Sequence, residues 1–113
     1  MIRLAMAGAL GRMGRTILAL ALKDKEFRIT GALEQAGRSE IGADVGPFLG
    51  VSPLGVEVSS DLETVLKRSD VLIDFTSFSA TPRHLAAAKK TGTGYVLGTT
   101  ALPENVQIGR AHV

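Results

Sequence analysis

The feature that most constrains the fold is an apolar run that opens directly into three evenly spaced glycines. Residues 2–7 are too short and too apolar for a surface helix, so they predict a strand buried on both faces. Gly8, Gly11 and Gly14 follow at three-residue spacing. Apolar residues then recur at the steps of an amphipathic helix: Met13, Ile17, Leu18, Ala21 and Leu22. A strand, a glycine turn and a helix in this order are typical of a phosphate-binding turn.

Each glycine has a separate physical role in such a turn. Gly8 permits the tight turn, Gly11 lets a phosphate approach the backbone, and Gly14 allows close packing of the helix. The helix start directs free N–H groups and a positive dipole end at an anion, and Arg12 adds a full charge. The spacing G-x-x-G-x-x-G alone also fits an ordinary tight turn of any α/β protein.

The next segment favours a dinucleotide site over an ordinary turn. Residues 27–33 predict a second strand, and Glu34 follows that strand. Glu34 lies 20 residues beyond Gly14, which is the separation expected for a carboxylate that grips an adenosine ribose.

The middle of the chain is less regular. Glycines and prolines interrupt residues 36–55, which indicates a long surface loop, and such loops usually serve a site. Residues 56–58 predict a short third strand. Ser60 begins a capping box completed by Glu63, and the helix that it opens should end near Arg68.

The last part of the chain returns to alternating strands and helices. Residues 71–75 and 94–97 predict the fourth and fifth strands. After a polar turn over residues 76–81, a helix is expected with Thr81 as its N-cap and Gly92 as its stop. This alternation predicts a Rossmann-type parallel sheet in the order 3-2-1-4-5 with helices on both faces. The turns at 8–14, 76–81 and 98–100 should then meet at the carboxyl edge, where ligands bind.

Composition excludes several classes of protein. The 113 residues suffice for one small globular domain, with 45% hydrophobic and 21% charged residues. No apolar run is long enough to span a bilayer, and the absence of cysteine excludes disulfides and thiolate metal sites. The formal charge of +2 forms no basic stripe, so nucleic acid is not expected as a partner. We expect a cytoplasmic protein without a metal site.

Other candidate catalytic groups are few. His84 has no partner at triad or metal spacing, so it predicts a surface or packing role, and His112 is expected to be inert. Asp70 and Asp74 fit either a pair of carboxylates or, as we prefer, a turn residue before the strand and a polar residue at its end. Three hydroxyls without a nearby base are interpreted as turn and cap residues: Ser77, Ser79 and Thr81. No catalytic residue is assigned within the chain.

With these residues in view, the chain resembles the amino-terminal part of dihydrodipicolinate reductase (4-hydroxy-tetrahydrodipicolinate reductase) of bacterial lysine and diaminopimelate biosynthesis. The resemblance covers residues 2 to about 102 and rests on the runs at 7–14, 31–34, 73–76 and 96–100. It implies reduction of 4-hydroxy-tetrahydrodipicolinate, a cyclic dicarboxylate, to tetrahydrodipicolinate by NADH or NADPH. It also implies that full-length members are homo-oligomeric.

The resemblance assigns residues to three parts of the cofactor. The pyrophosphate would be held by Gly8, Ala9, Leu10, Gly11, Arg12 and Met13. Glu34, with Gln35 beside it, would contact the adenosine ribose, and Gly98, Thr99 and Thr100 the nicotinamide end. Thr100 would also touch the substrate.

Two positions depart from the family pattern. Some members carry Arg after the ribose-binding Glu, where it pairs with the 2′-phosphate of NADPH, and this chain has Gln35. The neutral amide favours NADH, with Arg12 as the alternative cation for a 2′-phosphate. Ala101 stands where the family has Gly.

The resemblance also implies a domain organisation. Residues 1–102 would form a dinucleotide-binding domain whose sheet is incomplete at its C-terminal end, and 103–113 a tail that departs from the family. The family's catalytic and tetramerisation domain lies outside these residues, so we expect the chain to supply cofactor binding without turnover. The alternative is a non-catalytic NAD(H)-binding regulatory module, which the fold alone does not distinguish.

Overall fold

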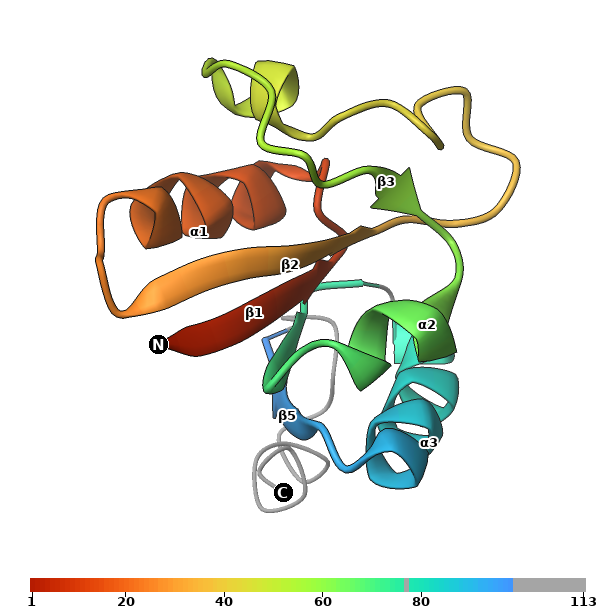
Figure 1. The fold of residues 1–113 in the computed structure, drawn as a ribbon. Coiled ribbons are helices and arrows are strands. Elements are labelled where there is room, and N and C mark those ends of the chain that lie inside the picture. The colour runs from red at the N-terminus through yellow and green to blue at the C-terminus, as the bar shows by residue number, and fades with distance from the viewer. Residues whose placement is uncertain (77, 99–113) are drawn as a thin grey trace.

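A computed structural model describes residues 1–76 and 78–98 of the chain. Its core is a five-stranded sheet in the order β3-β2-β1-β4-β5, with every neighbouring pair parallel (Figure 1). The elements in chain order are β1 (Ile2–Ala7), α1 (Arg12–Leu22), β2 (Phe27–Leu33), the 3₁₀ turn η1 (Gly46–Leu49), β3 (Val58–Ser59), α2 (Leu62–Lys67), β4 (Val71–Asp74), the 3₁₀ turn η2 (Phe78–Ala80), α3 (Thr81–Thr91) and β5 (Gly94–Leu97). The predicted fold class and strand order are confirmed.

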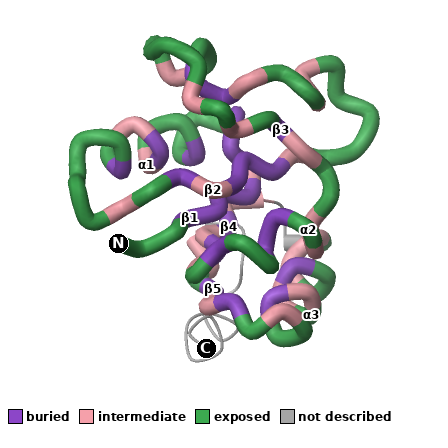
Figure 2. Tube along the Cα trace, in the orientation of Figure 1, coloured by how far each residue is buried: buried purple, intermediate pink, exposed green. Residues whose placement is uncertain are grey.

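The sheet separates two hydrophobic layers. Helix α1 covers one face, and α2 and α3 lie together on the other (Figure 1). Because side chains alternate along a strand, Leu4 and Met6 pack toward α1, whereas Ala5 and Ala7 pack toward the α2–α3 side. Figure 2 shows that the buried residues concentrate along the central strands.

The buried side of α1 agrees with the prediction at Ile17, Leu18 and Ala21 and departs from it at Met13 and Leu22. Gly14, Leu18 and Ala21 are buried, whereas Met13 is exposed over 47% of its surface. A Cβ atom at Gly14 would lie 2.1 Å from the Gly8 carbonyl oxygen, so the helix meets the turn at a glycine. This contact fixes the rotation of α1 and leaves Leu22 partly exposed, at 39%.

Asp44 organises the long loop between β2 and β3. Its carboxylate accepts hydrogen bonds from the backbone N–H groups of Gly46, Leu54, Gly55 and Val56. These bonds, led by the one from Leu54, lower the pKa of Asp44. They also explain why β3 is Val58–Ser59 and not the predicted 56–58, since the loop already engages Val56.

Two helix starts differ from the prediction by one residue. Asp61, and not Ser60, caps α2, because its carboxylate accepts from the N–H of Thr64 at 3.3 Å and from the Thr64 hydroxyl at 2.8 Å. Helix α3 begins at Thr81 itself, with Ala80 as its N-cap and without a side-chain cap. The helix ends are as expected, with Arg68 and Gly92 as the C-caps.

The contact between Gly31 of β2 and Val65 of α2 gives a test of the packing. A Cβ at Gly31 would lie 2.1 Å from Val65 Cγ1, so Gly31→Ala should lower the free energy of unfolding by about 1–3 kcal/mol. In a Val65→Ala background the closest contact is gone and only the Ala5 Cβ, at 3.1 Å, stays tight, so the same change should cost at least about 0.5 kcal/mol less. Urea denaturation of the four chains measures this difference. An equal cost in both backgrounds would contradict the contact.

Candidate functional site

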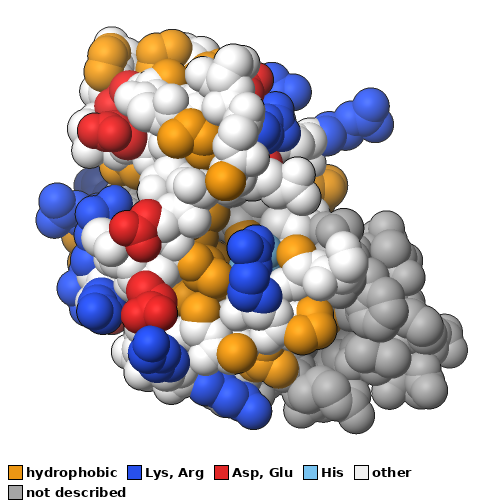
Figure 3. Space-filling view, turned by 90° about the vertical axis from the view of Figure 1, so that its right-hand side faces the viewer, with side chains coloured by type: hydrophobic (Ala, Val, Ile, Leu, Met, Phe, Trp, Pro, Cys, Tyr) orange, Lys and Arg blue, Asp and Glu red, His pale blue; other side chains and the backbone are white. Residues whose placement is uncertain are grey.

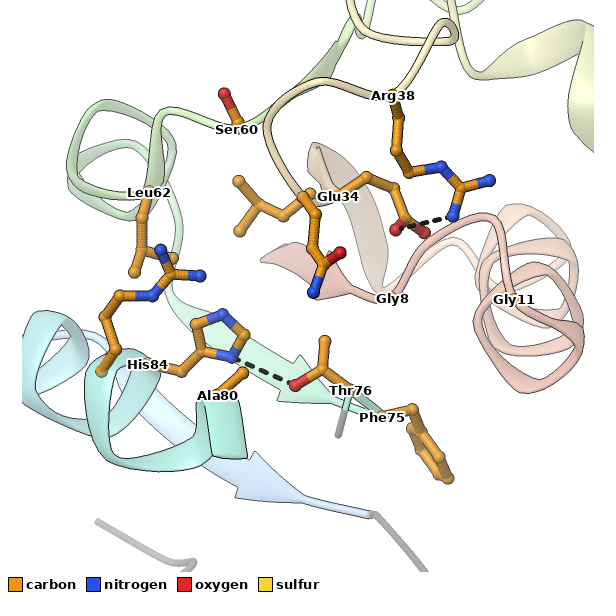
Figure 4. Close-up of a pocket in the computed structure, with 13 residues that line it drawn as sticks. Gly8, Gly11, Glu34, Arg38, Ser60, Leu62, Phe75, Thr76, Ala80 and His84 are labelled. Carbon is orange, nitrogen blue, oxygen red and sulfur yellow. Dashed lines mark hydrogen bonds and ion pairs between the residues drawn. The ribbon is translucent and has the colours of Figure 1, made fainter. Parts of the chain in front are cut away.

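A cavity of about 270 Å³ opens at the carboxyl edge of β1, β2 and β4. Figure 3 views the molecule from the side of this edge, where basic and acidic side chains lie close together. In the close-up of Figure 4, the Gly8–Gly11 turn, Glu34 and Arg38 lie on one side of the cavity, and Leu62 and His84 on the other. The remaining lining residues are Leu33, Gln35, Ser60, Phe75, Thr76, Ala80 and Arg83.

The glycine turn forms one wall of the cavity, and its first residue, Gly8, has a backbone conformation that favours glycine. Gly8 has a φ of 77°, and a Cβ there would lie 3.2 Å from the Phe75 carbonyl oxygen. The N–H groups of Gly8 and Ala9 both donate to the carbonyl of Leu33, at 3.0 and 3.2 Å. The end of β2 therefore holds the start of the turn in place.

The turn leads into the N-terminus of α1, which has the properties of an anion site. Gly11 is the N-cap without a side-chain cap, and the first helical turn contains no acidic residue. Within the described residues, the backbone N–H groups of Arg12, Met13 and Gly14 have no hydrogen-bond partner. Among the described residues, a Cβ at Gly11 would meet only the Gly8 carbonyl, at 3.4 Å, which leaves open space beside it. These features fit a phosphate group.

The carboxylate of Glu34 links the end of β2 to the turn. Its Oε2 accepts the Leu10 N–H at 2.8 Å, and its Oε1 accepts the Arg38 Nη1 at 3.3 Å. Only 8% of the Glu34 side chain is exposed. Sequence reasoning singled out Glu34 and Gln35, both of which line the cavity, but it missed Arg38. The sequence signal that could have identified Arg38 is its position four residues after Glu34, in the loop that follows β2.

On the opposite wall, Asp74 is buried within a network of hydrogen bonds. Its Oδ2 accepts from His84 Nδ1 at 2.7 Å and from the Tyr95 hydroxyl at 2.5 Å. Its Oδ1 accepts from both the N–H and the hydroxyl of Thr76. Burial alone would raise the pKa of Asp74, but the bonds from His84, Thr76 and Tyr95 outweigh it and lower the pKa overall. Asp74 is therefore ionised. In its hydrogen bond with His84, Nδ1 of the histidine is the donor and carries the proton.

This network changes the interpretation of His84. The sequence showed no partner for it, whereas the structure places it against Asp74, buried to 5% exposure, with its other ring nitrogen on the cavity side (Figure 4). Of its two expected roles, the packing role fits and the surface role does not. Burial and the Asp74 carboxylate raise the pKa of Tyr95 well above its ordinary value.

The other predicted residues lie at different distances from the cavity. Ala9 and Leu10, within the turn, are buried, and Arg12 lines a separate hollow beside Phe48. Gly98 packs against the Phe75 ring, which a Cβ would approach to 2.4 Å. The predictions for Ser77, Thr99, Thr100, Ala101 and His112 concern residues outside the described part of the chain.

Asp70 and Asp74 do not form a carboxylate pair. Asp70 lies just before β4, where Arg3 donates to it at 2.8 Å from its backbone and at 2.9 Å from Nη2. The bonds from Arg3 lower its pKa to about 2. In the described residues, no group of three His, Cys, Asp or Glu is placed to hold a metal ion. The helices of this part of the chain include none long and apolar enough to cross a bilayer.

Comparison with known proteins links this site to one family. The family model described as dihydrodipicolinate reductase, N-terminus, matches residues 2–109. The 4-hydroxy-tetrahydrodipicolinate reductase of Paraburkholderia phymatum is 44% identical over 102 residues, which is 90% of this chain and 38% of that protein. The chain spans about two fifths of the length of the curated relatives that it matches.

Two solved structures resemble the fold. An amine dehydrogenase from Mycobacterium smegmatis has a TM-score of 0.73 and 26% identity, and the match covers 85% of this chain and 29% of that one. A dipicolinate-bound dihydrodipicolinate reductase from Paenisporosarcina sp. TG-14 has a TM-score of 0.67 over 93% of this chain and 40% of its own. At 21% identity, the second match supports the fold alone.

The bond between Tyr95 and Asp74 can be tested by removing one oxygen atom. Tyr95→Phe should lower the free energy of unfolding by about 1.5–3 kcal/mol at pH 7, because it removes a hydrogen bond to a buried carboxylate. A carboxylate with a lowered pKa stabilises the fold above its unfolded pKa, near 3.8, and this contribution is lost as the pH falls through the folded value. The difference between the two chains should therefore narrow below pH 3.8. Denaturant unfolding from pH 7 to pH 2.5 measures it, and a difference that does not change with pH would contradict the assignment.

Proposed function

The chain belongs to the family of the dihydrodipicolinate reductase amino-terminal region, and on that premise we propose that it binds NADH or NADPH for the family's reduction. The reaction would convert 4-hydroxy-tetrahydrodipicolinate, a small cyclic dicarboxylate, to tetrahydrodipicolinate. Residues 1–102 would serve as the dinucleotide-binding part of that enzyme. The bound nicotinamide supplies the hydride, and this chain's residues bind and orient the cofactor.

The observation that best supports cofactor binding is the group of free N–H donors at the start of α1. A pyrophosphate beside Gly11 would accept hydrogen bonds from Arg12, Met13 and Gly14, whose N–H groups have no partner among the described residues. The helix dipole and the missing Cβ at Gly11 favour the same ligand. An apolar ligand would leave these donors unsatisfied.

Glu34 would bind the adenosine ribose from the neighbouring strand. Its two oxygens already accept from Leu10 and Arg38, which fixes the carboxylate beside the turn. A carboxylate has about four acceptor sites, so ribose hydroxyls can still donate to it. The apolar side chains of Leu33, Leu62 and Ala80 line the same cavity and offer a surface for the adenine ring.

Gly98 lies at the end of β5, where the nicotinamide half would extend. Its N–H donates to the Asp74 carbonyl at 2.8 Å, and its lack of a side chain lets the Phe75 ring pack against it. By family resemblance Thr99 and Thr100 continue this contact, and Thr100 touches the substrate. The Asp74 network would then hold the β4 turn and β5 in fixed positions beneath the ring.

The pyrophosphate position can be tested at Gly11, whose φ of −71° is open to any residue. Gly11→Val should fold and should lower the affinity for NADH at least tenfold, because the branched side chain occupies the phosphate position. Loss of one charge-assisted phosphate contact, about 1.5–3 kcal/mol, is enough for that change. Isothermal titration gives the affinity, and thermal denaturation checks the fold.

Gly11→Ala is the matched control for this substitution. Its Cβ would lie 3.4 Å from the Gly8 carbonyl, an ordinary contact, so the alanine chain should lose less affinity than the valine chain. Unchanged affinity in a folded Gly11→Val chain would rule out the proposed pyrophosphate position.

A further inference from the structure

Arg38 places a cation beside the carboxylate that would bind the ribose. From this arrangement we infer that Arg38 binds a phosphate on the adenosine 2′-hydroxyl, so that the chain accepts NADPH despite the neutral Gln35. The inference rests on the proposed cofactor site and names the residue that recognises one form of the cofactor. The residue belongs to the loop after β2 and not to the position that follows Glu34.

The position of Arg38 follows from its contact with Glu34. Its Nη1 lies 3.3 Å from Glu34 Oε1, and Arg38 lines the cavity beside the Gly8–Gly11 turn (Figure 4). Ribose hydroxyls bound to Glu34 would lie within reach of this guanidinium. In dinucleotide-binding folds, a nearby arginine is the group that accommodates a 2′-phosphate.

The guanidinium has hydrogen-bonding capacity left for a phosphate. Arg38 donates from Nε and Nη2 to Glu40, at 3.3 and 3.4 Å, and from Nη1 to Glu34. An arginine has five N–H donors, so two remain after these three bonds. The three bonds are also longer than the 2.7–2.9 Å typical of charge-assisted pairs. With 43% of the side chain exposed, the guanidinium can turn toward a doubly charged phosphate.

The charge around the cavity is compatible with the same ligand. Glu34 would repel a 2′-phosphate if its charge stood alone, but the Leu10 N–H and Arg38 both offset that charge. The charged residues that line the cavity are Glu34, Arg38 and Arg83, and Glu40 lies against Arg38, so cations and anions are equal in number around Arg38. An additional anionic group is therefore tolerated in this cavity.

The other three candidates for this role are less well placed. Gln35 lines the cavity but carries no charge, and Arg12 lines a separate hollow with Arg15 and Phe48. Arg83 lines the cavity from α3, on the side of Leu62, whereas Glu34 follows β2. Arg38 alone among these residues contacts the ribose-binding carboxylate.

Two adenosine nucleotides that lack the nicotinamide half of the cofactor allow the effect of the 2′-phosphate on binding to be measured by itself. We expect the unaltered chain to bind adenosine 2′,5′-bisphosphate more tightly than adenosine 5′-monophosphate in isothermal titration. Arg38→Gln should weaken the bisphosphate about tenfold or more and the monophosphate less than about threefold, since only the first loses a charge-assisted contact. Arg38→Lys keeps the charge without the planar fork and should give an intermediate loss.

Two further variants act as controls. Arg28→Gln, on β2 outside the cavity lining, makes the same change in net charge and should leave both affinities within about threefold of the unaltered chain. Arg83→Gln tests the opposite wall and should not discriminate between the two ligands. Thermal denaturation of each variant checks the fold.

The outcomes separate this inference from the proposed function. Equal losses of both ligands in Arg38→Gln, no loss of either, or a selective loss in Arg83→Gln would each overturn the role of Arg38 and leave the cofactor site standing. Failure of the unaltered chain to bind either ligand, NADH or NADPH would refute the cofactor site, and the role of Arg38 with it.

Discussion

The structure depends on how closely α1 approaches the turn that precedes it. At Gly14 the helix backbone lies so near the Gly8 carbonyl that a single methyl group would overlap it, at 2.1 Å. This approach fixes the rotation of the helix and directs its first N–H groups toward the carboxyl edge of the sheet. The same edge receives Glu34 from β2, whose carboxylate accepts the Leu10 N–H. The start of α1 and the Glu34 carboxylate are thus parts of one arrangement.

A second network organises the other half of that edge. Asp74 ends β4, and its partners come from the following turn, from α3 and from β5: Thr76, His84 and Tyr95. A buried carboxylate with this many donors holds three elements in register. The cavity therefore has a wall built around the glycine turn and a wall built around Asp74, and its shape depends on both.

The sequence was sufficient for the sheet order and for most element bounds, because those follow from hydrophobic period and glycine position. Where the prediction differed, a specific contact in the folded chain decided several of the outcomes. Asp61 replaced Ser60 as the cap because its carboxylate reaches both polar groups of Thr64. The pairing of His84 with Asp74 was not visible, because ten residues of turn and helix separate them and only the packed fold brings them together. The contact of Arg38 with Glu34 was missed because the position of the Arg38 side chain depends on the path of a loop with no regular period. The preference for NADH expected from Gln35 stays a prediction.

The carboxylate of Asp44 also divides the connection between β2 and β3 into two segments. By binding four N–H groups at its base, it closes residues 44–56 into a unit with its own internal bonds. The short arm between Glu34 and Asp44, which carries Arg38 and Glu40, is anchored at both ends and contributes little to the buried core. Mutations in that arm can alter its charge without disturbing the sheet. Substitutions at Arg38 and Glu40 should therefore change the charge beside Glu34 at small cost to the stability of the fold.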